Sequence, residues 1–238
     1  MTGTFLGTLT DLFYPRRCPV CDRAVRPFGS LICETCENEL AYVKPPCCMK
    51  CGKELSGSAE EYCGDCMSRR HLFDSGRALF EYKSAADAIY HFKYKGRQEY
   101  GKYFAACMAA RMGEWIAECR PDAFIPVPIH ASKERVRGYN QAQVLARELG
   151  AVMDIPVVDD LVRRVRKTAP MKDLPLAERQ NNLKRAFKIC RNDVKLDTAI
   201  IIDDIYTTGS TIDAISYELR RAGVKHIYFA ALAIGNGI

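Results

Sequence analysis

Apolar and polar residues alternate in blocks along the C-terminal two thirds of the chain. Short apolar runs, rich in β-branched and aromatic residues, stand at 76–82, 123–127, 155–158, 186–189, 197–202 and 226–233, and each predicts a strand. Between them, 84–95, 98–119 and 140–150 carry apolar residues at helical spacing, with Ser84 as the expected N-cap of the first helix. Strands that alternate with helices predict an α/β fold with a doubly wound, largely parallel sheet.

One of the predicted strands leads into a cluster of small polar residues. Residues 200–202 are three consecutive isoleucines, typical of a strand covered on both faces, and two acids end that strand. A helix that ends near Gly223 follows the loop. The acids and the loop residues are Asp203, Asp204, Thr207, Thr208, Gly209, Ser210 and Thr211. A glycine-containing turn at a helix N-terminus leaves N–H groups unpaired, which predicts an anion site.

The acid pair restricts the kind of anion. Two adjacent carboxylates would repel a bare phosphate, so the ligand must also offer hydroxyls or a metal ion. A ribose 5-phosphate does so, with its phosphate on the loop and its 2- and 3-hydroxyls facing Asp203 and Asp204. The alternative is a strand-end turn that only caps a helix, since Asp and Thr are ordinary N-cap residues.

Residues 200–211 resemble the ribose-phosphate loop of type I phosphoribosyltransferases: an apolar triplet, two acids, and Thr-Thr-Gly-any-Thr. The resemblance implies phosphoribosyl pyrophosphate with magnesium as the ligand, and Asp203 and Asp204 as catalytic-site residues. In a parallel sheet the turn after Pro128 lies on the same rim as this loop. This turn carries Arg135 and Arg137, whose guanidinium groups can bind a pyrophosphate through bidentate contacts. The alternative is that the two arginines only form a solvated basic loop. Residues 92–97, basic with interleaved aromatics, either line this site or simply end a helix.

Cysteine organises the N-terminal third of the chain. Eight of the 12 cysteines form four Cys-x-x-Cys pairs, and the two halves repeat with an offset of 30 residues. The pairs are Cys18/Cys21, Cys33/Cys36, Cys48/Cys51 and Cys63/Cys66. Two such pairs complete a four-thiolate zinc site, so we expect two structural zinc ions in an N-terminal double zinc ribbon.

The cysteine spacing favours pairing within each repeat over a cross-brace. Disulfides would need an oxidising compartment that nothing else in the sequence indicates. Cys47 could replace Cys48 as a ligand only with poorer geometry. We therefore expect a helix and zinc ribbon over residues 1–70 and a phosphoribosyltransferase-like domain over 71–238.

Positive charge is concentrated in one segment. The formal net charge is +6, and residues 162–191 alone hold ten basic side chains against two acids. Two prolines, at 170 and 175, predict a loop in its first part, and 177–183 predicts a short helix. The segment is a mobile cover over a phosphorylated ligand, a track for a nucleic-acid backbone, or a solvated surface.

The rest of the composition is that of a globular protein, with 48% apolar and 27% charged residues. No run approaches the ~20 apolar residues of a membrane span. Residues 1–14 predict a packing helix rather than a secretory signal, because the stretch lacks a basic start and contains Asp11. We therefore expect a cytoplasmic protein.

In order along the chain, these motifs closely resemble the ComF family of competence proteins. They are the double zinc ribbon, Lys-Tyr-Lys-Gly at 93–96, Pro-Val-Pro at 126–128, Arg-Gly-Tyr-Asn-Gln at 137–141, Thr168 with Leu174, Arg179 and Asn182, and the loop at 200–211. Met171 stands where the family usually has Gln, so if that Gln contacts a ligand in the family, the contact is lost here. The resemblance implies a sheet of the type I phosphoribosyltransferase kind and a link to uptake of single-stranded DNA in natural transformation.

Two functions remain open on the sequence alone. As an enzyme, the protein would transfer ribose 5-phosphate to an unidentified acceptor in nucleotide metabolism, with magnesium, Arg135 and Arg137 stabilising the leaving pyrophosphate. As an accessory factor, it would bind the same ligand without turnover. Its zinc ribbon and basic segment would then contact single-stranded DNA or another competence protein.

Overall fold

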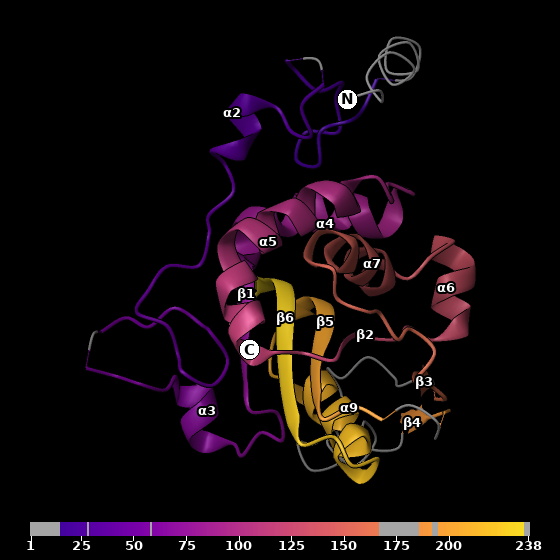
Figure 1. Ribbon diagram of the computed structural model, residues 1–238. Helices are drawn as coiled ribbons and strands as arrows, with labels where there is room; N and C mark the ends of the chain where they lie inside the picture. Colours follow the sequence, from indigo (N-terminus) through magenta and orange to yellow (C-terminus); the bar gives the residue numbers. More distant parts are fainter. Residues whose placement is uncertain (1–14, 28, 58, 167–185, 192–194, 236–238) are drawn as a thin grey trace.

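The computed structural model describes residues 15–27, 29–57, 59–166, 186–191 and 195–235 (Figure 1). Its main sheet has four parallel strands in the order β1-β6-β5-β2. These strands are β1 (Ser75–Glu81), β6 (His226–Ile234), β5 (Thr198–Tyr206) and β2 (Ala123–Pro126). The predicted parallel α/β sheet is confirmed.

Helices cover both faces of this sheet (Figure 1). On one face lie α4 (Tyr82–Tyr94), α5 (Tyr100–Cys119) and α7 (Gln141–Met153), and on the other lies α9 (Ser210–Arg221). Ile200 and Ile202 pack in the core on the α4–α5–α7 side, and Ile201 packs on the α9 side. All three isoleucines are fully buried, as expected for a strand covered on both faces.

Two strand predictions and one loop prediction need correction. β5 runs through both acids to Tyr206, because its last residues stay in register with β6 up to Ile234. Residues 155–158 form only one parallel bridge, between Val157 and Phe124, since Pro156 has no N–H to extend a ladder. The segment predicted as a loop from 162 begins instead with β3 (Val162–Arg164), which pairs antiparallel with β4 (Phe187–Ile189).

The helix boundaries also differ in part from the prediction. α4 begins at Tyr82, and Ser84 is not its N-cap, because the Ser84 hydroxyl accepts a 2.9 Å hydrogen bond from the N–H of Ala41. α7 is capped by Asn140 and continues past Gly150 to Met153. The additional helix α6 (Ala131–Arg137) occupies the turn after Pro128. The helices expected at 1–14 and 177–183 lie outside the described residues.

The two halves of the cysteine region pack at different places on the sheet domain (Figure 1). The first half, with α2 (Glu34–Glu37), joins the core on the α4–α5 side, and the second half, with α3 (Gly64–Ser68), joins the core on the α9 side. Residues 41–43 connect the halves and run antiparallel to β1, with Tyr42 opposite Phe80. Among the described helices, none combines the length and apolar character needed to cross a membrane.

Candidate functional site

The predicted phosphate loop lies at the carboxyl end of β5, where residues 207–209 lead into α9. Among the described residues, no side chain caps the N-terminus of α9, so its first N–H groups can bind an anion. Thr207 is exposed, and Thr208, Ser210 and Thr211 are half-buried. Thr208 Oγ1 lies 2.9 Å from Ser210 Oγ. The loop thus surrounds an open helix N-terminus with hydroxyl groups.

Gly209 is the position in this turn that accepts no side chain. Its φ is +73°, in the left-handed region that favours glycine. A Cβ atom there would lie 2.7 Å from the Tyr206 hydroxyl and 2.9 Å from the His71 ring, and both residues are buried. Backbone conformation and packing behind the loop therefore both require glycine.

Asp203 and Asp204 point to opposite faces of β5, because successive side chains of a strand alternate. The side chain of Asp204 lies on the α4–α5–α7 side of the sheet, and its Oδ2 is 3.0 Å from the Nζ of Lys93 on α4. The side chain of Asp203 lies on the α9 side of the sheet, and its Oδ1 accepts a 2.8 Å hydrogen bond from the N–H of Asp204. The two carboxylates therefore do not lie side by side on one face of β5.

Both acids are electrostatically compensated within the protein. The positive charge of the Lys93 ammonium offsets the negative charge of the Asp204 carboxylate. Asp203 is only 9% exposed, and this burial, followed by the charge of Asp204, raises the pKa of Asp203 to about 8. Burial therefore favours the neutral form of Asp203. The repulsion that two free carboxylates would exert on a phosphate is largely removed.

Further basic side chains gather around the acids. Arg164 on β3 lies within electrostatic reach of Asp203, and its guanidinium stands 5.4 Å from the ring centroid of Phe187. Burial lowers the pKa of Lys133 on α6, and the charges of Arg164 and Arg137 lower it further. Like charges held this close together are typical of a site that binds a polyanion.

Arg135 and Arg137 lie on α6 and not on a loop. The His130 side chain caps this helix, and Gly138 ends it with a φ of +83°. Arg137 donates 2.9 Å hydrogen bonds to Gln141 Oε1 and to the Tyr94 hydroxyl. Arg135 is exposed. The structure thus brings Arg137 to the basic cluster and places Arg135 on the outer surface.

The sequence prediction missed Lys133, assigned Arg164 only to a general basic segment, and left Lys93 undecided. A signal for Lys93 exists, because it follows the buried Ile89 by four residues and therefore lies on the inner face of α4. Arg164 has no such signal, since its position depends on a β4 partner that is distant in sequence. The rest of the basic segment, 167–185, lies outside the described residues.

The eight paired cysteines form two separate four-sulfur clusters, so pairing within each repeat is confirmed over a cross-brace. The clusters are Cys18, Cys21, Cys33 and Cys36, and Cys48, Cys51, Cys63 and Cys66, with the sulfurs of each within 4.8 Å of one another. Zn–S bonds of about 2.3 Å place tetrahedral sulfurs about 3.8 Å apart.

The geometry of the second cluster fits such an ion. Cys51 and Cys63 Sγ are 3.6 Å apart, and hydrogen bonding by Cys66 lowers the pKa of Cys51 to about 5, toward the thiolate that binds metal. Cys47 lies outside the cluster, and its thiol donates to the Lys44 carbonyl at 3.2 Å. Two four-sulfur sets with no open position support structural zinc.

The second cluster lies close behind the phosphate loop. Burial, followed by the charges of Cys51 and Cys66, raises the pKa of Tyr206, the residue just before the loop. On the linker leaving this cluster, His71 Nδ1 lies 2.8 Å from Asp213 Oδ2. The N–H of Leu72 donates to Asp213 Oδ1, also at 2.8 Å. Asp213 belongs to the first turn of α9, so the linker holds the helix end that is predicted to bind an anion.

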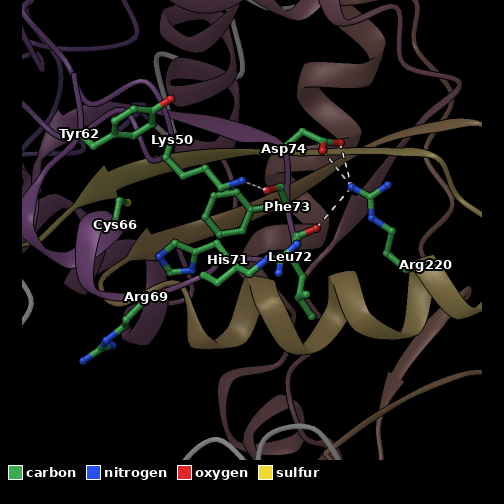
Figure 2. Close-up of a pocket in the computed structure, with 10 residues that line it drawn as sticks. Lys50, Tyr62, Cys66, Arg69, His71, Leu72, Phe73, Asp74 and Arg220 are labelled. Atoms are coloured by element: carbon green, nitrogen blue, oxygen red, sulfur yellow. Dashed lines mark hydrogen bonds and ion pairs between the residues drawn. The ribbon is translucent and has the colours of Figure 1, made fainter.

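A separate pocket of about 440 Å³ opens beside the same linker, between the second cysteine module and α9 (Figure 2). Arg220 bonds Asp74 at 2.9 Å, and the Lys50 ammonium donates to the Phe73 carbonyl. Arg69 points away from these contacts (Figure 2). The pocket is basic, but its charged groups mainly fasten the linker to α9 and to the second module.

Comparisons with known proteins agree with this architecture. A family model described as a double zinc ribbon domain matches residues 9–67. Competence protein F of Haemophilus influenzae is 30% identical over 227 residues, which cover 93% of this chain and 98% of that protein. DNA utilization protein YhgH of Salmonella typhi is 28% identical over 218 residues, covering 88% and 86% respectively.

Among solved structures, a purine phosphoribosyltransferase from Pyrococcus horikoshii aligns over 56% of this chain and 70% of its own. It is 19% identical, with a TM-score of 0.34. The strand pairings of this chain establish its parallel sheet independently of that alignment.

Proposed function

This chain belongs to the ComF family of competence proteins, and from that premise we propose that it binds phosphoribosyl pyrophosphate with magnesium at residues 203–211. We further propose that it serves as an accessory factor in the uptake of single-stranded DNA during natural transformation. The names of its relatives, competence protein F and DNA utilization protein, support this role. Zinc thiolates need a reducing compartment, which supports a cytoplasmic location.

The observation that carries the ligand proposal is the open N-terminus of α9 behind Gly209, next to a compensated acid pair. The loop N–H and hydroxyl groups would hold the 5-phosphate. Asp203 and Asp204 would exchange hydrogen bonds with the sugar hydroxyls, and the ionised carboxylate of Asp204 suits magnesium. Magnesium would supply charge neutralisation for the pyrophosphate, and Arg137 and Lys133 would bind the same group from α6.

Calorimetry with phosphoribosyl pyrophosphate and magnesium tests this site. Asp203→Asn combined with Asp204→Asn is expected to abolish binding while the zinc content and thermal unfolding stay those of a folded chain. Asp197→Asn is the matched control, because this acid precedes the same strand and its side chain is 70% exposed. Unchanged affinity in the double variant would show that the ligand site lies elsewhere.

A second candidate function is active phosphoribosyl transfer, and the raised pKa of Asp203 favours it. A carboxyl group with a pKa of about 8 can exchange a proton near neutral pH, as general acid–base catalysis requires. The test is pyrophosphate release from phosphoribosyl pyrophosphate and magnesium in the presence of a pool of nucleobases. Tight binding without any release would exclude turnover with these acceptors and leave the accessory role.

A further inference from the structure

Two exposed tyrosines lie on the outer side of α4, one turn apart. Tyr90 and Tyr94 are 51% and 55% exposed, and their ring centroids are 5.2 Å apart. The guanidinium of Arg137 on α6 stands 4.7 Å from the ring centroid of Tyr94 and also bonds its hydroxyl. We call Tyr90, Tyr94 and Arg137 the tyrosine platform. Its rings are held by an aromatic contact and a cation–π contact, yet about half of their surface stays open to solvent.

Basic residues stand close to this platform in the sequence. In residues 90–97, Lys93 pairs with Asp204 and Arg97 pairs with Asp22, so Lys95 is the remaining lysine or arginine of that stretch. Residues 131–137 hold three basic side chains and one acid. Lys95 and Arg135 are exposed, and among the described residues no acid lies within ion-pair distance of either. These two cations are therefore available to an anionic partner.

We propose that the tyrosine platform binds single-stranded nucleic acid, with bases stacked on Tyr90 and Tyr94 and phosphates on Lys95 and Arg135. Open aromatic rings match this partner when unpaired cations lie close by, because every unpaired base has a stackable face and every nucleotide carries a charge. Lys95 follows Tyr94 in the chain, and Arg135 lies on α6, the helix whose Arg137 contacts Tyr94. A duplex cannot offer its base faces to the rings. This inference deepens the proposed DNA role and rests on it, but it does not depend on phosphoribosyl pyrophosphate.

The platform adjoins the candidate ligand site through α4. Tyr94 points outward, whereas its neighbour Lys93 points inward to Asp204. Arg137 belongs to both regions, because its charge acts on Lys133 and its guanidinium covers Tyr94. A strand bound on the platform would therefore pass beside the ligand site.

Fluorescence anisotropy of the full zinc-loaded chain with labelled oligothymidylate tests the proposal. Tyr90→Leu with Tyr94→Leu removes the rings and is expected to weaken binding about 30-fold, from the loss of two stacked bases. Tyr90→Phe with Tyr94→Phe keeps the rings and is expected to bind like the wild type. Lys95→Ser leaves the rings in place and is expected to lower the slope of log affinity against log salt by about 0.7.

Tyr62→Leu with Arg70→Ser is the matched control, because it removes a half-exposed tyrosine and a cation from the pocket of Figure 2. This control is expected to bind oligothymidylate like the wild type. If the control variant loses affinity for oligothymidylate and the platform variants do not, the single strand binds at the pocket and the proposal is wrong. Equal losses in the Leu and Phe platform variants would also contradict base stacking.

An absence of oligothymidylate binding by the wild type would overturn the platform proposal together with the DNA role. Calorimetry with phosphoribosyl pyrophosphate on the same preparation would still report on the ligand site, so the two failures are distinguishable. The salt slope of Lys95→Ser keeps the proposal testable if the Leu variant fails to fold.

Discussion

The two zinc modules have the same local structure and dock onto the sheet domain by different means. The turn around the first Cys-x-x-Cys pair of each module, at residues 18–23 and 48–53, is here called the knuckle. Two backbone hydrogen bonds in the first knuckle measure 2.8 and 2.9 Å, and the equivalent bonds 30 residues later measure 2.7 and 2.9 Å. The residue after the second cysteine of the knuckle has a left-handed backbone in both, with φ of +54° at Asp22 and +73° at Gly52. The two halves of the repeat therefore share the backbone structure of the knuckle but differ in the residue at this position.

That position determines how each module docks. Asp22 accepts hydrogen bonds from the Tyr100 hydroxyl at 2.6 Å and from Arg97 Nε at 2.9 Å, which joins the first module to α5 and the residues before it. Gly52 has no side chain, and its Cα packs so close to β1 that a Cβ would lie 2.7 Å from the Gly76 carbonyl oxygen. Within the described residues, only the linker that leaves the second module contacts the first turn of α9, through His71 and Asp213. The first module therefore braces helices, whereas the second supports the candidate ligand site.

Removing one zinc site at a time should give the largest contrast. Cys51→Ser with Cys63→Ser is expected to weaken phosphoribosyl pyrophosphate binding by about 100-fold or more, because the metal supplies most of a small module's folding free energy. Cys18→Ser with Cys36→Ser is expected to change that affinity by less than about threefold, since its module packs away from the loop. Calorimetry and zinc content per chain measure both effects. Equal losses in the two variants would remove the functional difference between the modules.

Asp203 on β5 and Asp22 in the first module should differ in their effect on the pH dependence of stability. The pKa of Asp203 is raised to about 8, so its contribution to stability is fully present below an unfolded pKa of about 3.9 and is lost as pH rises through 8. Between pH 5 and 8 the free energy of unfolding should fall by up to about 1 kcal/mol per pH unit, and Asp203→Asn should remove this fall. Against the effect of burial, hydrogen bonds from Tyr100 and Arg97 lower the pKa of Asp22, which stays ionised throughout this range.

Denaturant unfolding at several pH values, with zinc content checked at each, measures this contrast. Asp22→Asn should leave the slope between pH 5 and 8 unchanged. A wild-type slope that persists in Asp203→Asn would show that another group titrates in this window.

Substitutions at the two equivalent knuckle positions should both destabilise the chain. Gly52→Ala places a Cβ against the backbone of β1 in a left-handed conformation, and we expect a loss of about 3 kcal/mol in the free energy of unfolding. Asp22→Ala leaves the buried Tyr100 hydroxyl without its acceptor, and we expect a loss of about 2 kcal/mol. Only Gly52→Ala should also weaken phosphoribosyl pyrophosphate binding. Calorimetry on Asp22→Ala that showed the same weakening would contradict this separation.

The smallest effect is expected from the contact between the linker and α9. Asp213→Ala removes the acceptor of His71 and of the Leu72 N–H, at a cost of about 1 kcal/mol in stability. Because the loop loses its support, affinity for phosphoribosyl pyrophosphate should fall about fivefold, which corresponds to about 1 kcal/mol. Asp197→Ala, an exposed acid before β5, should leave the affinity unchanged. If both variants bind alike, the linker does not position the loop.

The sequence predicts those parts of the molecule that depend on local spacing. The four Cys-x-x-Cys pairs lie within short hairpins, so the two zinc clusters follow from a few neighbouring residues. The isoleucine triplet predicts the central strand for the same reason, because three consecutive apolar residues indicate a strand that is buried on both faces.

The sequence does not predict contacts between elements that are distant along the chain. The divergence of Asp203 and Asp204 follows from strand alternation, but their partners on α4 and β3 depend on how those elements pack. The same holds for the docking of the modules, since Asp22 and Gly52 occupy equivalent places in the repeat and contact unrelated surfaces. Tertiary packing, which no local pattern encodes, therefore determines the surroundings of the candidate site.

The short segment at residues 41–43 has a consequence for the protein's behaviour in solution. β1 is the outermost strand of its sheet, and hydrogen bonds from this segment occupy the edge that would otherwise face water. An uncovered edge strand is a template for pairing with another chain, which leads to aggregation. Because the segment is held between the two modules, loss of either metal ion would loosen this cover. Chelation is therefore expected to yield self-association, visible in light scattering, and not only a local change of structure.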